Sequence, residues 1–204
     1  MNKKIQFFKK TLPIIIIALV FMGVAYIVNL QTEVAENVLR LHIVAESNSI
    51  SDQLIKLCVR DRVISEFSEV LKECRSAEDA AELAEEFLPE IERCARQELA
   101  RFGKREVAAK VEKCRFPTKK YGSMTFPAGD YTALNIRIGD AEGRNWWCVM
   151  YPPLCLNDSC ASMPEASAEK LKESLTEEGY ELITKNTLDV KIKFKIAEII
   201  FGDL

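Results

Sequence analysis

The chain has 204 residues, of which 48% are hydrophobic and 29% are charged, values typical of a folded globular protein and not of a disordered one. Four of its 28 basic residues precede an apolar segment near the N-terminus, so the rest of the chain carries 24 basic and 31 acidic groups. An acidic body without a basic stripe argues against a nucleic-acid partner.

Residues 1–30 have the features of an export segment. Four lysines between positions 3 and 10 precede Leu12–Val28, a run of 17 residues without a charge. A basic stretch followed by an apolar one directs the remaining chain across the membrane. Gly23-Val24-Ala25 has the small-x-small pattern of a cleavage site, but the run is also just long enough to span a bilayer. We expect a signal peptide or membrane anchor over residues 1–30 and a single exported domain over residues 36–204.

The first elements of this domain are a strand and a helix. Val38–Val44 reads as the strand, and Ser49 or Ser51 can cap the helix, with Asp52 at its positive end. Apolar residues then recur at helical spacing, and the opposite side is expected to be exposed. The apolar stripe comprises Leu54, Leu57, Cys58, Ile64, Phe67 and Leu71, and the exposed side carries Lys56, Arg60 and Asp61.

A second helix is predicted to begin at the capping-box sequence Ser76-Ala77-Glu78-Asp79 and to end near Gly103. Pro89 interrupts its apolar stripe and must kink the helix or start a new one. Both helices are amphipathic, which is typical of helices that cover a sheet.

From Val107 the apolar period changes to two, which predicts strands. The predicted strands and turns lie at 107–112, 124–126, 127–130 (a turn), 132–138, 139–143 (a turn), 145–151 and 190–200. Residues 163–188 are polar and helix-prone, and we interpret them as a surface helix or a mobile excursion. We therefore expect an α+β fold, a two-layer sandwich in which two helices cover one face of a mainly antiparallel sheet.

The run Asn145–Cys155 holds both tryptophans, Trp146 and Trp147, followed by Pro152 and Pro153. Adjacent strand residues point to opposite faces, so one indole should enter the core while the other faces outward or lies under a loop. The two prolines should end the strand, because neither has an N–H to donate.

Seven cysteines lie in a chain that we expect to be exported, where thiols can pair. Cys58, Cys74 and Cys94 fall at apolar helical positions and are read as small buried hydrophobes. Cys148 and Cys155 flank the prolines, and we expect them to form a local disulfide. Zinc is not expected, because the sequence has one histidine and no Cys-x-x-Cys.

His42 is the only histidine, so a Cys–His or Ser–His catalytic pair would have to use it. The sequence has no Gly-rich phosphate loop, no His-Glu-x-x-His and no Gly-x-Ser-x-Gly. We expect no cofactor and no small-molecule substrate. Aromatic, basic and Pro-rich loops are instead typical of protein interfaces. The candidate partner-binding residues are Lys119, Tyr121, Gly122, Trp146, Trp147, Pro152 and Pro153, with Arg40 and Arg60 beside them.

Four blocks of the sequence together resemble the stage II sporulation protein R family. They are Arg40-Leu41-His42-Ile43-Val44-Ala45-Glu46-Ser47-Asn48-Ser49 with the following Asp52 to Asp61, Phe116 to Tyr131, Asn145 to Cys155, and Val190 to Ile200. The resemblance covers nearly all of the expected exported domain.

The resemblance implies a signalling protein that is made in the forespore and exported into the space between the two membranes around it. There it would activate a membrane-embedded aspartic protease of the mother cell, which processes the precursor of the early mother-cell sigma factor. The chain would then be a ligand and not an enzyme. Two alternatives stay open: an exported thiol hydrolase using His42 and a nearby cysteine, and a cell-envelope interaction domain without a signalling role.

Overall fold

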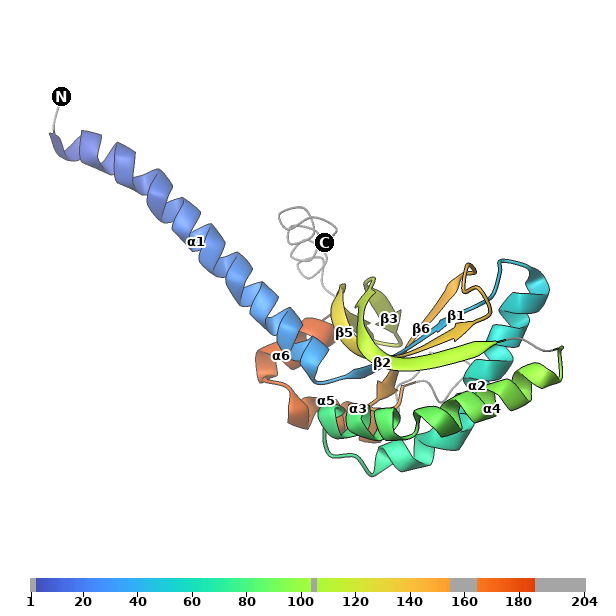
Figure 1. Ribbon diagram of the computed structural model, residues 1–204. Coiled ribbons are helices and arrows are strands. Elements are labelled where there is room, and N and C mark those ends of the chain that lie inside the picture. Colours follow the sequence, from blue (N-terminus) through green and yellow to red (C-terminus); the bar gives the residue numbers. More distant parts are fainter. Residues whose placement is uncertain (1–2, 104–105, 155–164, 186–204) are drawn as a thin grey trace.

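The computed structural model describes residues 3–103, 106–154 and 165–185 (Figure 1). The fold is α+β, as predicted, and its four-stranded sheet is mainly antiparallel. The elements in chain order are α1 (Lys3–Glu36), β1 (Leu39–Val44), α2 (Ile50–Lys72), α3 (Ala77–Glu86), α4 (Leu88–Ala100), β2 (Val107–Phe116), β3 (Lys119–Tyr121), β4 (Met124–Phe126), β5 (Gly129–Ile138), β6 (Asn145–Tyr151), α5 (Glu165–Ser174) and α6 (Glu177–Thr184).

The four-stranded sheet has the order β2-β5-β1-β6. The outer pairs β2–β5 and β1–β6 are antiparallel, whereas the central pair β1–β5 is parallel and places His42 beside Asn135. Strand alternation puts Arg40 and His42 on one face of the sheet and Leu41 and Ile43 on the other. The two faces therefore have different chemistry along the same central strand.

Helices α2, α3 and α4 pack on the face that bears Leu41 and Ile43, below the sheet in the view of Figure 1. The expected interruption at Pro89 takes the form of a new helix: α3 ends at Glu86, and α4 starts at Leu88 with Pro89 in its first turn. Proline is tolerated there because a first-turn N–H has no intrahelical partner. Three helices, instead of the expected two, therefore cover this face.

The start of α2 is as predicted, because Ser49 accepts a hydrogen bond from the Asp52 amide at 3.1 Å. The predicted exposed side of α2 is wrong in part. Leu54 is 58% exposed, whereas Lys56 and Arg60 are only 4% and 8% exposed. The buried stripe runs instead through Ile55, Val59 and Val63. Lys56 and Arg60 are buried because their long side chains lie against β6 and the loop before it, where their polar ends find oxygen acceptors or aromatic rings.

Strands β3 and β4 form a separate two-stranded hairpin. It turns at Gly122, whose φ of 56° lies in the left-handed region that glycine adopts without strain. Tyr121, Met124 and Phe126 are buried. This hairpin, residues 119–126, therefore packs through side chains on the sheet face that α2–α4 leave open.

Helix α1 runs without interruption from the apolar segment into the domain. Residues Thr11–Glu36 are long and apolar enough to cross a membrane, with a mean hydropathy of 2.6. Near its end Leu30 and Val34 are buried in the domain core, and β1 starts only three residues after α1 ends.

The described part of the 163–188 segment forms α5 and α6, which pack on the domain. Leu171 and Ile183 are buried, and Glu33 of α1 accepts hydrogen bonds from the amide and hydroxyl of Thr176, the residue that caps α6. The predicted closing strand, 190–200, lies outside the described residues.

Candidate partner-binding site

Arg40 lies on the sheet face that α2–α4 leave open. The hairpin packs over it there, and it is 0% exposed. Four aromatic rings surround its guanidinium carbon, which lies 4.4–5.6 Å from their centroids. The rings come from β2, the hairpin and β5: Phe116, Tyr121, Phe126 and Tyr131. A cation over aromatic faces is stabilised by their negative potential, most strongly where water is excluded.

Hydrogen bonds join Arg40 to two other elements. Its Nε donates to the Cys148 carbonyl oxygen on β6 at 3.0 Å, and its Nη2 donates to the Tyr121 hydroxyl at 3.1 Å. The Tyr121 hydroxyl in turn donates to the Trp147 carbonyl oxygen at 3.0 Å. The hairpin and the tryptophan strand, which are far apart in the sequence, are therefore joined through one arginine.

Arg40 has no carboxylate partner among the residues that the structure describes. Its Nη1 is buried and finds no hydrogen-bond acceptor in that part of the chain. Burial lowers the pKa of Arg40 from its ordinary value, while the neighbouring tyrosines act in the opposite direction. Burial also raises the pKa of Tyr131, whose hydroxyl donates to the Pro127 carbonyl oxygen at 2.6 Å. The site thus contains a buried positive charge that aromatic rings and neutral oxygens stabilise.

The two tryptophans lie on opposite faces of β6, as strand alternation predicts. Trp146 contacts α2, where the Arg60 guanidinium carbon lies 4.4 Å from its ring centroid, and Arg60 also pairs with Asp61. Trp147 lies on the other face, stacked on His42 with ring centroids 3.9 Å apart. Both indoles are half-buried, so neither is confined to the core.

The His42 ring belongs to a polar row that crosses the open sheet face. His42 Nε2 lies 2.8 Å from Asn145 Oδ1, and Asn135 Nδ2 donates to a Glu112 carboxylate oxygen at 2.6 Å. His42 Nδ1 and Asn135 Oδ1 are both buried and have no hydrogen-bond partner among the described residues. Burial lowers the pKa of His42, so the ring is neutral near pH 7. The strand periodicity of β2 and β5 was the only signal in the sequence for this row.

The described residues give little support to a Cys–His catalytic pair. Cys58 and Cys94 lie on α2 and α4, which pack on the opposite face of the sheet from His42. Cys114 is on β2 opposite Tyr131, four residues along β5 from Asn135. Burial raises the pKa of the Cys114 thiol to about 11, which disfavours the thiolate that such chemistry needs.

The end of β6 is buried: Cys148, Pro152 and Pro153 are not part of an exposed loop. Pro152 and Pro153 are both buried, and the Ser167 hydroxyl of α5 donates to the Pro153 carbonyl oxygen at 2.8 Å. Cys148 is disulfide-bonded, whereas the other cysteines of the described residues are free thiols. Cys155 lies outside the described residues, so the pairing of Cys148 with Cys155 stays a prediction.

The predicted binding residues therefore divide into two groups. Arg40, Tyr121 and Trp147 lie together, and Lys119 and Gly122 continue from them along the hairpin as half-buried residues. The hairpin also exposes Lys120 on its outer side. The second group comprises Trp146, Arg60, Pro152 and Pro153. Trp146 and Arg60 contact each other on the helix-covered face of the sheet, and Pro153 is hydrogen-bonded to α5.

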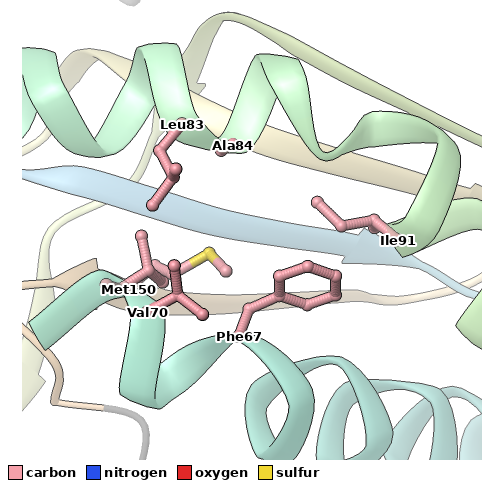
Figure 2. A pocket seen from close by; sticks show the side chains of 7 residues that line it. Phe67, Val70, Leu83, Ala84, Ile91 and Met150 are labelled. Carbon is pink, nitrogen blue, oxygen red and sulfur yellow. The ribbon is translucent and has the colours of Figure 1, made fainter.

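A hollow lies between α2, α3, α4 and β6 (Figure 2). Its lining is entirely apolar: Phe67, Val70, Leu71, Leu83, Ala84, Ile91 and Met150. Figure 2 shows Leu83 pointing from α3 toward Met150 of β6 and Val70 of α2. Without a polar group to orient a ligand, it has the character of an imperfectly filled core.

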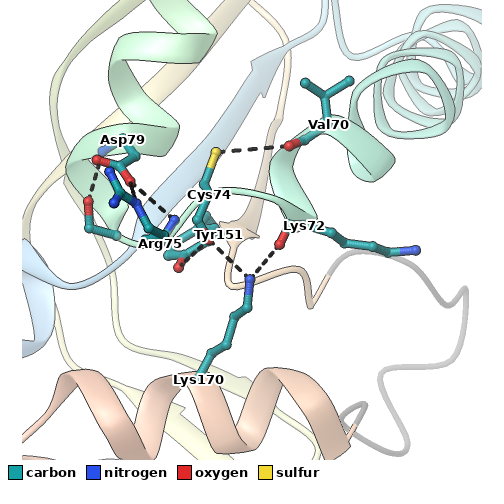
Figure 3. A network of polar contacts seen from close by, with 8 residues as sticks. Val70, Lys72, Cys74, Arg75, Asp79, Tyr151 and Lys170 are labelled. Carbon is teal, nitrogen blue, oxygen red and sulfur yellow. Dashed lines mark hydrogen bonds and ion pairs between the residues drawn. The ribbon is translucent and has the colours of Figure 1, made fainter.

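A polar cluster closes the C-terminal end of α2 (Figure 3). Lys170 Nζ of α5 donates to the carbonyl oxygens of Lys72 and Cys74, and the Tyr151 hydroxyl donates to the same Cys74 oxygen at 3.1 Å. The last carbonyl groups of a helix lack intrahelical donors, and lysine commonly satisfies them. This cluster fixes α5 against α2 and has a structural role.

Comparisons with known proteins agree with the resemblance seen in the sequence. The family model for stage II sporulation protein R (spore_II_R) matches residues 35–161. Stage II sporulation protein R of Bacillus subtilis (strain 168) is 35% identical over 167 residues, which cover 81% of this chain and 72% of that protein. No solved structure matches.

Proposed function

This chain belongs to the stage II sporulation protein R family, and on that basis we propose that it is an exported signalling ligand of endospore formation. In this proposal the chain is made in the forespore and acts from the space between the two surrounding membranes. It activates a membrane-embedded aspartic protease of the mother cell, which then processes the precursor of the early mother-cell sigma factor.

One observation carries the proposal beyond family membership. The hairpin and the tryptophan strand meet over the buried Arg40, so the half-buried Trp147 and the lysines of the hairpin lie close to one junction. Aromatic and arginine side chains concentrate binding energy at protein interfaces. A ligand that switches on a protease needs such a surface and does not need a catalytic centre of its own.

The long apolar helix supports the export part of the proposal. Four lysines precede the apolar segment and the folded domain follows it. This order leaves the domain on the far side of the membrane. Either cleavage or retention of this helix is compatible with a ligand that acts between two membranes.

The decisive experiment is reconstitution. Candidate protease and sigma-factor precursor are placed together in vesicles, and precursor cleavage is measured with and without the full chain in detergent. We expect cleavage to depend on the added chain and to disappear when a catalytic aspartate of the protease is replaced by asparagine. Equal cleavage without the chain, or with chain that has been irreversibly unfolded, would contradict the proposal.

A further inference from the structure

The hairpin is the centre of a purely basic region in the otherwise acidic part of the chain that follows the apolar segment. Between Glu112 and Asp130 the sequence contains four basic residues and no acidic one. Two of the four, Lys119 and Lys120, lie on β3 of the hairpin itself. The chain as a whole has a net charge of −3, so this concentration of one sign is local.

Most of this positive charge is not neutralised within the described structure. Arg115 forms an exposed ion pair with Asp130 at 3.4 Å, but Lys119 and Lys120 form none with the described residues. Helix α6 packs on β4 and carries acidic residues, yet the ion pair found on it joins Glu181 to its own Lys185. The neighbouring acidic helix therefore leaves the hairpin lysines available.

Arg40 adds a third uncompensated charge directly beneath the hairpin. It is fully buried, and the described residues offer it no carboxylate partner and offer its Nη1 no hydrogen-bond acceptor. Charges in a low-dielectric interior are screened less than charges at the surface, so its field extends through the hairpin to the outside. The hairpin thus combines two accessible lysines with a buried charge of the same sign.

We propose that the hairpin 119–126 is the docking site for an acidic segment of the protein partner. The positive charge of the site selects acidic side chains. The aromatic rings around Arg40 hold the hairpin in place, so little conformational entropy is lost when a partner binds. The inference rests on the proposed function only for the identity of the partner. The preference for acidic peptide is a property of this chain and can be measured without the protease.

The test uses the full chain in phosphatidylcholine nanodiscs and a fluorescein-labelled hexaglutamate peptide, with hexaglutamine as the uncharged control. Fluorescence anisotropy should show saturable binding of hexaglutamate and none of hexaglutamine. Binding should weaken as the salt concentration rises from about 50 mM to about 300 mM, because the screening length shortens and the attraction between opposite charges decreases. The double variant Lys119→Gln/Lys120→Gln should lose about tenfold in affinity, the effect of two partly screened ion pairs.

The matched control is Lys110→Gln/Lys113→Gln, which removes the same charge from two exposed lysines of β2 outside the hairpin. It should bind hexaglutamate as the wild-type chain does. Equal losses in the two double variants, or no hexaglutamate binding at about 1 mM peptide, a concentration that detects even weak sites, would overturn the inference. Capture by phosphatidylglycerol vesicles that depends on Lys119 and Lys120, without peptide binding, would also overturn it in favour of a lipid surface.

Discussion

Arg40 shows how a charged residue can serve as the centre of an aromatic cluster. Removal of its side chain should leave a cavity between four rings, so Arg40→Ala is expected to lower the free energy of unfolding by about 3–5 kcal/mol. Arg40→Met refills most of that space without burying a charge and should cost no more than about 1–2 kcal/mol. Urea denaturation of both variants measures the difference. Equal destabilisation by Ala and Met would show that the two hydrogen bonds, and not the packing, make the arginine necessary.

His42 allows a pH prediction because it is the only histidine. Burial lowers its pKa in the folded state below the unfolded value of 6.5, so the unfolded chain binds the proton more readily. The contribution of His42 to stability is therefore complete above pH 6.5 and is lost as the pH falls through the folded pKa.

The measurement is the melting temperature between pH 7.5 and pH 5, compared with that of His42→Phe. Phenylalanine keeps a ring for stacking on Trp147 but cannot titrate, so the variant should show a smaller decrease over this range. The same decrease in both proteins would assign the pH dependence to carboxylates instead.

At the scale of elements, local signals in the sequence predicted most of the secondary structure. Ser49 caps α2, Pro89 starts a new helix, and the period of two from Val107 marks the strands, because each of these depends on nearby residues alone. The face of α2 was predicted less well. Lys56 and Arg60 are charged residues, which sequence reasoning places on the exposed side of a helix. Only the position of β6 in the fold explains why they are buried.

The loops at the ends of β1 and β5 depend on one glycine. The Gly143 amide donates to the Ala45 carbonyl oxygen at 2.9 Å, and an added Cβ at Gly143 would overlap the Ser47 carbonyl group. Because both obstacles are backbone atoms, Gly143→Ala should destabilise the protein by about 2–3 kcal/mol.

A suitable comparison is Gly129→Ala, whose added Cβ would have Tyr131 Cε2 as its nearest neighbour at 3.5 Å, an ordinary contact. Thermal unfolding should show a clear loss for Gly143→Ala and a change within about 1 kcal/mol for Gly129→Ala. Indistinguishable melting temperatures would mean that the loop moves to accept the methyl group.

At the scale of the whole molecule, the sequence predicted which segments form the candidate site better than it predicted their roles. The hairpin and the tryptophan strand do meet, through Tyr121 and Trp147. Arg40, by contrast, is their buried support and not an exposed anchor, and Arg60 belongs with Trp146 on the opposite face. These assignments depend on strand pairing between residues far apart in the chain, which no local pattern specifies.

Helix α1 has a C-terminal part that packs in the domain core and an apolar part that is exposed. Val34 is 0% exposed in the domain core, whereas Val20 is 54% exposed in the apolar segment. Val34→Ala should therefore lower the unfolding free energy by about 1–3 kcal/mol, while Val20→Ala in the same helix should leave it unchanged. Replacement of the exposed residues 12–22 by an unrelated apolar span should also preserve stability, measured by urea denaturation in detergent micelles. If that replacement destabilises the domain as much as Val34→Ala does, the apolar segment is part of the fold and its function is not limited to crossing or leaving the membrane.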